Sequence, residues 1–290
     1  MKDNIVIDSE LVRRLVATQF SQWKDLPVQP VAFGGWDNRT FHLGEHMLVR
    51  MPSDEEYVVS VEKEQRWLPK LAPLLPLPIP APLAMGTPAE GYPWKWSIYR
   101  WIDGETAAVG QIADMCEFAT SLAQFLTILQ NIDATDGPIN PWRGGDLVMY
   151  DDEMRQAITI LKDKIDSKTA TKIWEEALAT KWQGSPVWIH GDVAVGNLLV
   201  KDGKLSAVID FGSMGVGDPA CDLVMTWTLF KDESREVFRK LLPLDPGTWA
   251  RARAWALWKA LIVCAGLCGT NPLETEKSWH VIDEVLADYL

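Results

Sequence analysis

Two aspartates and one asparagine follow short apolar runs in the second half of the sequence. Asp192 and Asn197 lie in the segment HGDVAVGN, directly after the apolar residues VWI. Asp210 comes directly after another apolar run, SAVI, and the Asp202-Gly203 pair before that run predicts a tight turn. Because a hairpin brings strand ends together, we expect both carboxylates to emerge at one end of the same sheet.

Oxygen ligands gathered in this way suit Mg²⁺, which takes one or two protein groups together with phosphate oxygens. Asn197 and Asp210 could hold the ion, and Asp192 would then be available to orient a hydroxyl nucleophile. Phosphoryl transfer depends mainly on positioning and charge neutralisation, so this set of residues is sufficient in kind. A single Asp or Asn in a loop more often caps a turn. The chemical interpretation therefore depends on all three occurring together.

The first hundred residues contain further parts of such a site. A turn with Gly34 and Gly35 could present backbone N–H groups to phosphates. Arg50, on a later predicted strand, would add a fixed positive charge, and Glu64 in the following helix could hold it by an ion pair. Arg–Glu pairs are common on protein surfaces and usually contribute little. The order and spacing of these residues therefore indicate a phosphate site more strongly than any one of them does alone.

The elements that must position these residues are a small β-rich unit and a mainly helical one. Residues 8–24 are predicted to form an amphipathic helix capped by Asp8 or Ser9. Three short strands follow, with turns at Gly34-Gly35 and Gly44-Glu45. The remaining predicted elements of the first half are a helix (59–75), a Pro-rich extended segment (76–88), a strand leading into a turn (94–104) and a long helix (110–132).

Composition excludes several classes of protein. The chain has 28 basic and 40 acidic residues and a net charge of −12, which argues against a nucleic-acid partner. Its four cysteines show no metal-ligand pattern, so a reduced, cytoplasmic setting is the simplest interpretation. The start lacks the apolar core of a signal peptide. The most apolar late run is interrupted by Lys259 and is too short to span a bilayer, so no membrane partner is expected.

The segments HGDVAVGN and VIDFGSMGVGDPACDL resemble the two signature segments of the aminoglycoside phosphotransferase and choline kinase superfamily. The order of strand, helix and LPLPIPAP in the first hundred residues is also similar to this family, and the resemblance covers most of the chain. It implies an α+β, bilobal protein-kinase-like fold with nucleotide bound between the lobes. A β-rich N-terminal lobe would comprise residues 1–102, and a larger, mainly helical lobe residues 103–290.

The resemblance also implies roles for individual residues. Asp192 matches the catalytic aspartate, Asn197 and Asp210 match the Mg²⁺ ligands, and Glu64 matches the helix partner of the strand cation Arg50. The hinge, whose backbone would bond the edge of adenine or guanine, corresponds to Tyr99, Arg100, Trp101 and Ile102.

Three departures from protein kinases stand out. The strand cation is Arg50, where many kinases use Lys, and Arg can bind phosphate oxygens in a bidentate way. The loop FGGWDNRT lacks the spaced glycines of protein kinases, and the catalytic segment reads His-Gly-Asp. We expect His190 to shape this segment by hydrogen bonding.

Asp218 and Pro219 predict a helix start, and Asp222 one turn later is expected to support the catalytic loop.

The sequence thus predicts an enzyme that moves the γ-phosphoryl group of ATP or GTP to a hydroxyl of a small molecule, with an aminoglycoside-type antibiotic as the best candidate. Macrolides, other sugars and amino alcohols are alternatives, as is a catalytically silent nucleotide-binding scaffold. Acidic groups beside Trp rings would suit a cationic acceptor. The acidic residues of the late helices are Asp232, Glu233, Glu274, Glu276, Asp283, Glu284 and Asp288.

Overall fold

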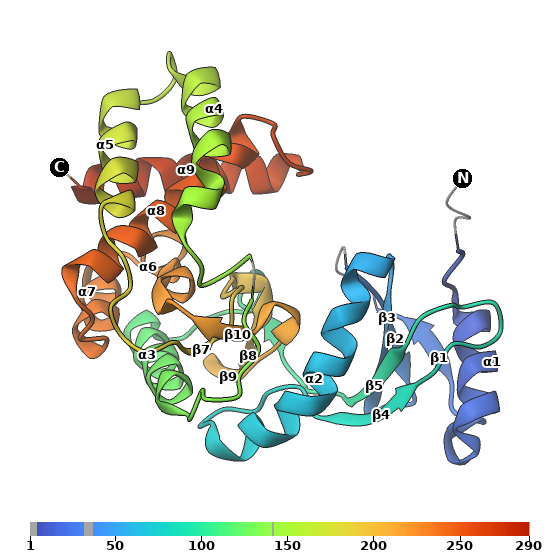
Figure 1. Ribbon diagram of the computed structural model, residues 1–290. Coiled ribbons are helices and arrows are strands. Elements are labelled where there is room, and N and C mark those ends of the chain that lie inside the picture. The colour runs from blue at the N-terminus through green and yellow to red at the C-terminus, as the bar shows by residue number, and fades with distance from the viewer. Residues whose placement is uncertain (1–4, 32–36, 141, 290) are drawn as a thin grey trace. The chain divides into compact units, whose positions relative to one another are not determined.

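The computed structural model describes residues 5–31, 37–140 and 142–289, and the chain forms two compact units (Figure 1). The first unit consists of Met1–Gly104 and Ser206–Gly212, and the second of Glu105–Leu205 and Ser213–Leu290. The sequence predicts lobes of residues 1–102 and 103–290. In the structure, the short segment Ser206–Gly212 packs with the first unit. Asp210 accordingly belongs to the first unit.

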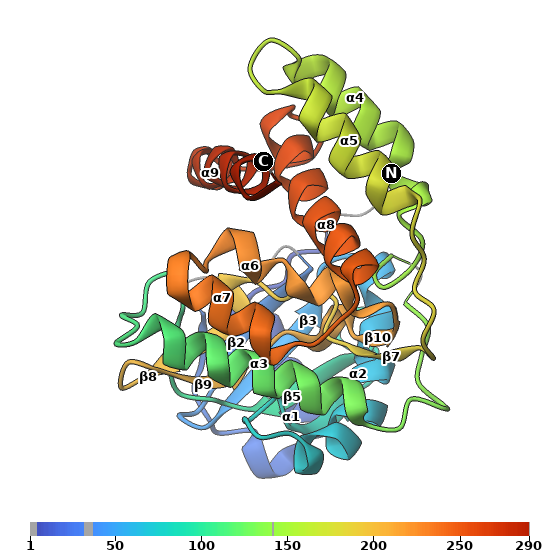
Figure 2. The ribbon, with the colours of Figure 1, turned by 90° about the vertical axis from the view of Figure 1, so that its left-hand side faces the viewer.

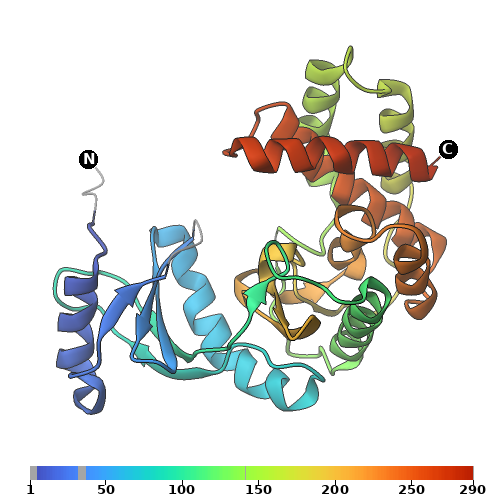
Figure 3. The ribbon, with the colours of Figure 1, turned by 180° about the vertical axis from the view of Figure 1, so that it is seen from behind.

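The first unit is built on a five-stranded antiparallel sheet in the order β1-β2-β3-β5-β4. Helices α1 and α2 flank this sheet on opposite sides (Figures 1 and 3). The elements are α1 (Ser9–Gln19), β1 (Val28–Pro30), β2 (Asn38–Leu43), β3 (Met47–Pro52), α2 (Val58–Leu71), β4 (Pro82–Gly86) and β5 (Trp96–Arg100).

Local sequence explains most of these elements. The Asp8 side chain caps α1 by accepting from the Leu11 N–H at 2.8 Å, which confirms the predicted cap. Val49 on β3 pairs with Phe41 on β2 and Ile98 on β5, and all three side chains are buried. Each buried side chain of this kind contributes about 1.5–3 kcal/mol relative to an exposed one. The three predicted strands are confirmed, whereas Gly34 and Gly35 lie outside the described residues.

The second unit is mainly helical. Helix α8 is apolar on nearly all sides, as expected of a buried helix, and it packs against α4, α5 and α9 (Figure 2). Within the described ranges, no helix is both long and apolar enough to cross a membrane. The helices are α3 (Met115–Asn131), α4 (Asp151–Leu161), α5 (Ser167–Leu178), α6 (Met225–Thr228), α7 (Asp232–Leu241), α8 (Pro246–Cys264) and α9 (Pro272–Tyr289).

The short strands of the second half do not form the single sheet that the sequence predicts. Strand β7 (Val187–Ile189) pairs with β10 (Gly215–Gly217), whereas β8 (Leu198–Lys201) pairs with β6 (Glu105–Thr106) and β9 (Lys204–Val208). The expectation that Asp192 and Asp210 end strands of one sheet is therefore wrong. A one-turn 3₁₀ helix between β7 and β8 redirects the chain, so the two strands join different partners.

The turn between β8 and β9 is the predicted one. Asp202 and Gly203 both have positive φ angles, +53° and +78°. This backbone conformation matches the right-handed twist of a two-residue hairpin and favours Asp-Gly.

Near the C-terminus, Asp288 joins α9 to the neighbouring helices. It accepts hydrogen bonds from Arg239 (2.9 and 2.5 Å), Arg253 (3.2 Å) and the Trp227 indole (2.9 Å). Burial alone would raise the pKa of Asp288, but these donors outweigh burial and lower it from 3.8 to about 2. The bonds therefore stabilise the fold fully above pH 3.8, and that stabilisation is lost as the pH falls through about 2.

We expect Asp288→Asn to reduce the free energy of unfolding at pH 7 by about 2 kcal/mol, since the charge that the arginines bind is removed. Urea unfolding at pH 7 and pH 3 measures this loss, which should shrink at the lower pH. Asp283→Asn, an exposed change on the same helix, is the control. An equal loss in both variants would contradict the assignment.

Candidate active site

In the first unit, Arg50 bridges two carboxylates. The strand β3 places its guanidinium so that Nη1 donates to Glu64 Oε2 at 3.2 Å and Nη2 donates to Asp210 Oδ1 at 2.8 Å. The pairing of the strand cation with the α2 glutamate therefore has the geometry that the sequence predicts. Asp210 lies 160 positions after Arg50 in the chain. It is the third predicted site residue that the structure places in this cluster.

Burial controls the electrostatics of this group. Glu64 is only 2% exposed, and burial raises its pKa, although Arg50 and the Tyr99 hydroxyl oppose that rise. For Arg50, burial would lower the pKa, but Glu64 and Asp210 outweigh it and the pKa is raised. Arg50 thus remains a cation, and the carboxylates orient it.

Asp210 has an unusual backbone conformation. Its φ is +63°, in the left-handed region that Asp tolerates better than most residues. Its side chain is 43% exposed, in contrast to the nearly buried Glu64. Asp210 can therefore serve Arg50 and still reach a ligand outside the protein. The neighbouring Gly212 carbonyl accepts from Lys63 Nζ at 2.7 Å, which ties this segment to α2.

The predicted hinge is partly occupied by contacts within the protein. The Tyr99 side chain is buried, and its hydroxyl donates to Glu64 Oε2 at 2.6 Å. The Arg100 amide donates to the Ala81 carbonyl, and the Trp101 amide donates to the His46 carbonyl at 2.8 Å. Of the four hinge residues, Ile102 is the one whose amide donates to no acceptor in the described part of the chain. Recognition of a base by this segment remains a prediction.

In the second unit, a buried aspartate holds the segment that follows β7. Asp222 accepts from the His190 amide at 2.7 Å and from the Gly191 amide at 2.8 Å. Burial raises the pKa of Asp222, and the hydrogen bonds from these two amides oppose the rise. This geometry is consistent with the supporting role predicted for Asp222. Asp218, the predicted helix cap, accepts from Ala220 N and pairs with Arg251.

Glycine is required at the centre of this segment. Gly191 has a φ of +81°, and a Cβ there would lie 2.3 Å from the Ser213 carbonyl oxygen. Any other residue would need both a strained backbone and a shift of that carbonyl. The His-Gly-Asp sequence therefore reflects close packing of the loop.

Asp192 and Asn197 are in direct contact. Asn197 Nδ2 donates to the Asp192 backbone carbonyl at 2.9 Å and to its carboxylate Oδ2 at 3.0 Å. The Asp192 amide in turn donates to His190 Nδ1 at 3.2 Å, as expected for a histidine that shapes the loop. Because the Asn197 amide nitrogen is used in this way, its Oδ1 is left as an acceptor for a cation. Asp192 itself is exposed.

The donor set fits Mg²⁺ in kind. Asn197 Oδ1 and the Asp210 carboxylate are hard oxygen ligands, and Mg²⁺ usually takes few of these from protein. Over the described ranges, no group of three or more His, Cys, Asp or Glu could hold a metal ion. Mg²⁺ held by either of these side chains would complete its coordination with phosphate and water oxygens.

Sequence reasoning missed two residues beside the loop. Arg143 Nε donates to the Gly191 carbonyl at 3.1 Å, and its guanidinium lies 5.5 Å from the Trp255 ring and 5.7 Å from the Trp258 ring. Asn140 holds this arginine by accepting from its amide at 3.0 Å. Both residues lie in an irregular segment without periodicity. Its only signal is the turn-rich sequence NPWRGGD.

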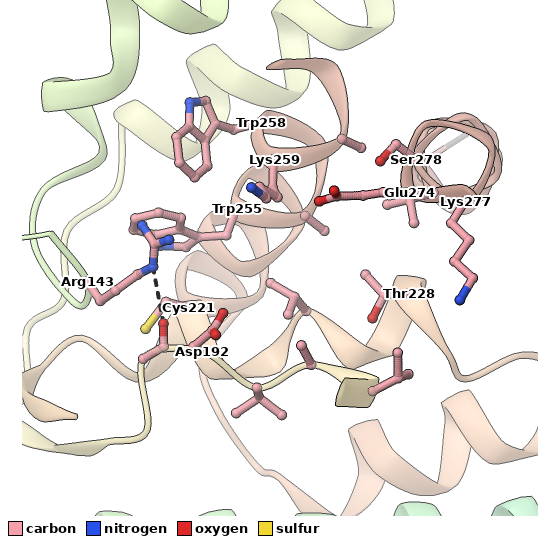
Figure 4. Close-up of a pocket in the computed structure, with 18 residues that line it drawn as sticks. Arg143, Asp192, Cys221, Thr228, Trp255, Trp258, Lys259, Glu274, Lys277 and Ser278 are labelled. Atoms are coloured by element: carbon pink, nitrogen blue, oxygen red, sulfur yellow. Dashed lines mark hydrogen bonds between the residues drawn. The ribbon is translucent and has the colours of Figure 1, made fainter. Parts of the chain in front are cut away.

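A cavity of about 240 Å³ opens next to Asp192 in the second unit (Figure 4). The segment that follows β7 and helix α6 form one side of it, and α8 and α9 form the other. Its polar lining residues are Arg143, Asp192, Cys221, Thr228, Lys259, Glu274, Lys277 and Ser278, together with the rings of Trp255 and Trp258. A small molecule in this cavity would lie beside the Asp192 carboxylate.

The bridging arginine supports a direct test. We expect Arg50→Ala to weaken ATP binding at least about tenfold and adenosine binding less than twofold, because only phosphates meet a guanidinium. Arg50→Lys should be partly tolerated, since it keeps the charge and loses the planar fork. Titration of both ligands by calorimetry measures these effects, with Arg66→Ala on the exposed face of α2 as control. Equal losses for adenosine and ATP would identify Arg50 as a packing residue.

Comparison with known proteins identifies the family of this chain. The model of the phosphotransferase enzyme family matches residues 28–255. An aminoglycoside 3'-phosphotransferase of Salmonella typhimurium is 28% identical over 153 residues, which cover 50% of this chain and 56% of that protein. The uncharacterized protein YcbJ of Bacillus subtilis (strain 168) is 27% identical over 184 residues, 60% of this chain and 55% of that protein. The chain thus spans a little over half the length of the curated relatives it matches.

Solved structures show the same fold. The GDP complex of aminoglycoside 2'-phosphotransferase-IIIa superposes with a TM-score of 0.74 at 16% identity, covering 98% of this chain and 100% of that one. Macrolide 2'-phosphotransferase MphH from Brachybacterium faecium gives a TM-score of 0.62 at 21% identity, covering 94% and 98%. These similarities confirm the predicted α+β, protein-kinase-like fold, with its β-sheet unit and its helical unit.

Proposed function

This chain belongs to the phosphotransferase enzyme family, and from that premise we propose that it transfers the γ-phosphoryl group of ATP or GTP to a hydroxyl of a small molecule. The observation that carries the proposal is the loop after β7, where Asn197 holds the exposed Asp192 carboxylate beside a cavity. A carboxylate in that position can accept the proton of a hydroxyl group bound in the cavity.

Each half of the site contributes to this function. Asp192 orients the acceptor hydroxyl and takes its proton as the hydroxyl oxygen bonds the γ-phosphorus and the bond from that phosphorus to the bridging oxygen breaks, which releases the nucleoside diphosphate. Arg50, oriented by Glu64 and Asp210, binds phosphate oxygens of the donor. Asn197 and Asp210 hold Mg²⁺, which neutralises phosphate charge when bound. The turn with Gly34 and Gly35 and the hinge at Tyr99–Ile102 complete the nucleotide site in this proposal.

The relatives indicate which acceptors to test first. Proteins named aminoglycoside 3'-phosphotransferase match this chain, so an aminoglycoside-type antibiotic is the first candidate. A macrolide is the second, because a macrolide 2'-phosphotransferase has the same fold. A cytoplasmic location is part of the proposal, since nucleoside triphosphates are abundant there.

A coupled nucleotide-turnover screen tests the proposal. Purified protein with Mg²⁺ and either ATP or GTP is incubated with aminoglycosides, macrolides, amino alcohols and sugars, and products are identified by mass. We expect one acceptor class to gain a single phosphoryl group. Tight nucleotide binding without transfer to any acceptor would instead favour the catalytically silent scaffold.

A further inference from the structure

The cavity beside Asp192 is lined by more positive than negative groups. Three cations, Arg143, Lys259 and Lys277, face two carboxylates, Asp192 and Glu274. The charged lining residues therefore have a net charge of +1, and of +2 if the catalytic Asp192 is left out. The whole chain has the opposite balance, with 28 basic and 40 acidic residues. The cavity therefore differs in sign from the protein around it.

The acidic residues that the sequence offers for a cationic acceptor lie mostly elsewhere. Of the seven in the late helices, only Glu274 lines this cavity. Glu284 forms ion pairs with Lys231 and Arg235, and Asp288 with three arginines. The other four are exposed: Asp232, Glu233, Glu276 and Asp283. In the part of the chain that the structure describes, the acidic residues of the late helices therefore do not gather into a pocket that would bind several ammonium groups.

The two lysines of the cavity are not neutralised by ion pairs. Lys259 on α8 and Lys277 on α9 are both exposed, and neither forms an ion pair with any residue that the structure describes. In Figure 4 the carboxylate of Glu274 points from α9 toward α8, which carries Lys259, while the Lys277 side chain extends from α9 on the side of Thr228. Glu274 also accepts a hydrogen bond from Thr270 at 3.0 Å. At least Lys277 is thus available to a ligand.

The rest of the lining is apolar. The guanidinium of Arg143 lies over the rings of Trp255 and Trp258, so this third cation is already flanked by aromatic surface. The remaining wall is formed by small and branched apolar residues, Val193, Ala194, Val195, Val224, Ala256, Ala260 and Val281. Such a wall suits the apolar body of a ligand, and the lysines at its edge suit an anionic group.

We propose that the acceptor bound in this cavity is a hydroxylated molecule with an apolar body and an anionic group such as a carboxylate, and that polycations bind poorly. The inference rests on the proposed function, because it takes the cavity as the acceptor site. A ligand with several ammonium groups would place like charges beside Lys259 and Lys277. Among the described lining residues, Glu274 is the one carboxylate besides Asp192 that could offset them.

Three probes that carry an anionic, a neutral or a cationic group on a common scaffold test this inference. They are 4-(2-hydroxyethyl)benzoate, the corresponding benzamide and the corresponding benzylamine, which share one ring and one hydroxyl. Ligand-observed NMR titration of the full chain gives the dissociation constants. We expect the benzoate to bind at least about fivefold more tightly than the benzylamine, with the benzamide between them, because exposed ion pairs have modest strength. Raising the salt concentration should reduce this preference.

Charge-reversal variants test whether Lys277 causes the preference for benzoate. Lys277→Glu should reduce or reverse the preference for benzoate, whereas Lys240→Glu, an exposed change of equal charge on α7, should leave it unchanged. Preference for the benzylamine, no binding of any probe, or equal effects of the two variants would overturn the inference.

The outcomes also separate this inference from the proposed function. Phosphoryl transfer to a polycationic aminoglycoside, without any preference for benzoate, would overturn the charge assignment and leave the phosphotransferase intact. A clear preference for benzoate in a protein that transfers phosphate to nothing would instead count against the proposed function.

Discussion

Asp192→Asn is expected to lower turnover by roughly 10²–10⁴-fold, because a carboxamide cannot accept the proton of the acceptor hydroxyl. The affinity for nucleotide should change little, since the residue lines the cavity that is proposed to bind the acceptor. Steady-state kinetics with the acceptor found by screening, together with calorimetric titration of ATP, measure both quantities. Near-normal turnover would remove Asp192 from the chemical step.

The loop should keep its shape in this variant, which makes the result interpretable. Asn197 would still donate to the backbone carbonyl of residue 192, and Asp222 would still hold the His190 and Gly191 amides. The matched control is Asp202→Asn, in the turn between β8 and β9, where Asn also tolerates the positive φ. That control should keep turnover within about twofold.

Asp210→Ala is expected to abolish Mg²⁺-dependent binding of ATP, a loss of roughly 10²-fold or more, while the helical circular dichroism stays unchanged. The Asp210 carboxylate is 43% exposed and in the proposed function would help to hold Mg²⁺, which would neutralise phosphate charge. ATP titrations with and without Mg²⁺ measure the effect. The difference between the two titrations should vanish in the variant.

A second substitution separates metal binding from local strain. Asp210 sits at a φ of +63°, where alanine is less favourable, and it also accepts from Arg50. Asp210→Asn retains tolerance of this conformation and an acceptor for Arg50, but it removes the charge. It should therefore fold normally and still lose most of the Mg²⁺ dependence. Unfolding of the alanine variant alongside normal Mg²⁺ dependence in Asp210→Asn would identify a turn-capping role.

Short-range features could be predicted from the sequence by itself. The cap at Asp8, the helix start at Asp218-Pro219 and the turn at Asp202-Gly203 depend on residues within a few positions of one another. Preferences for these conformations act locally, so they hold whatever the rest of the chain does. The contact between Asp192 and Asn197 is of the same kind, since five residues of one loop separate them.

The pairing of Arg50 with Glu64 was also expected from the sequence. Glu64 lies in the helix that follows the strand of Arg50, and the family resemblance implies the same pairing. The hydrogen bond that the Tyr99 side chain makes was not predictable. As part of the predicted hinge, Tyr99 is expected near a base through its backbone, whereas its hydroxyl binds the buried Glu64 carboxylate. A buried carboxylate needs hydrogen-bond donors, and which donor reaches it depends on how the strands pack.

Long-range arrangement was decided only by the tertiary structure. The sequence does not specify that β7 pairs with β10, that Asp210 reaches Arg50 across 160 positions of the chain, or that Asn140 and Arg143 pack against the catalytic loop. The same holds for the charge of the cavity. The acidic residues of the late helices are evident in the sequence, but packing of α9 directs Asp288 and Glu284 to arginines and leaves lysines facing the cavity. Helical periodicity predicts which residues share a face, and only the packing of one helix on another decides what that face meets.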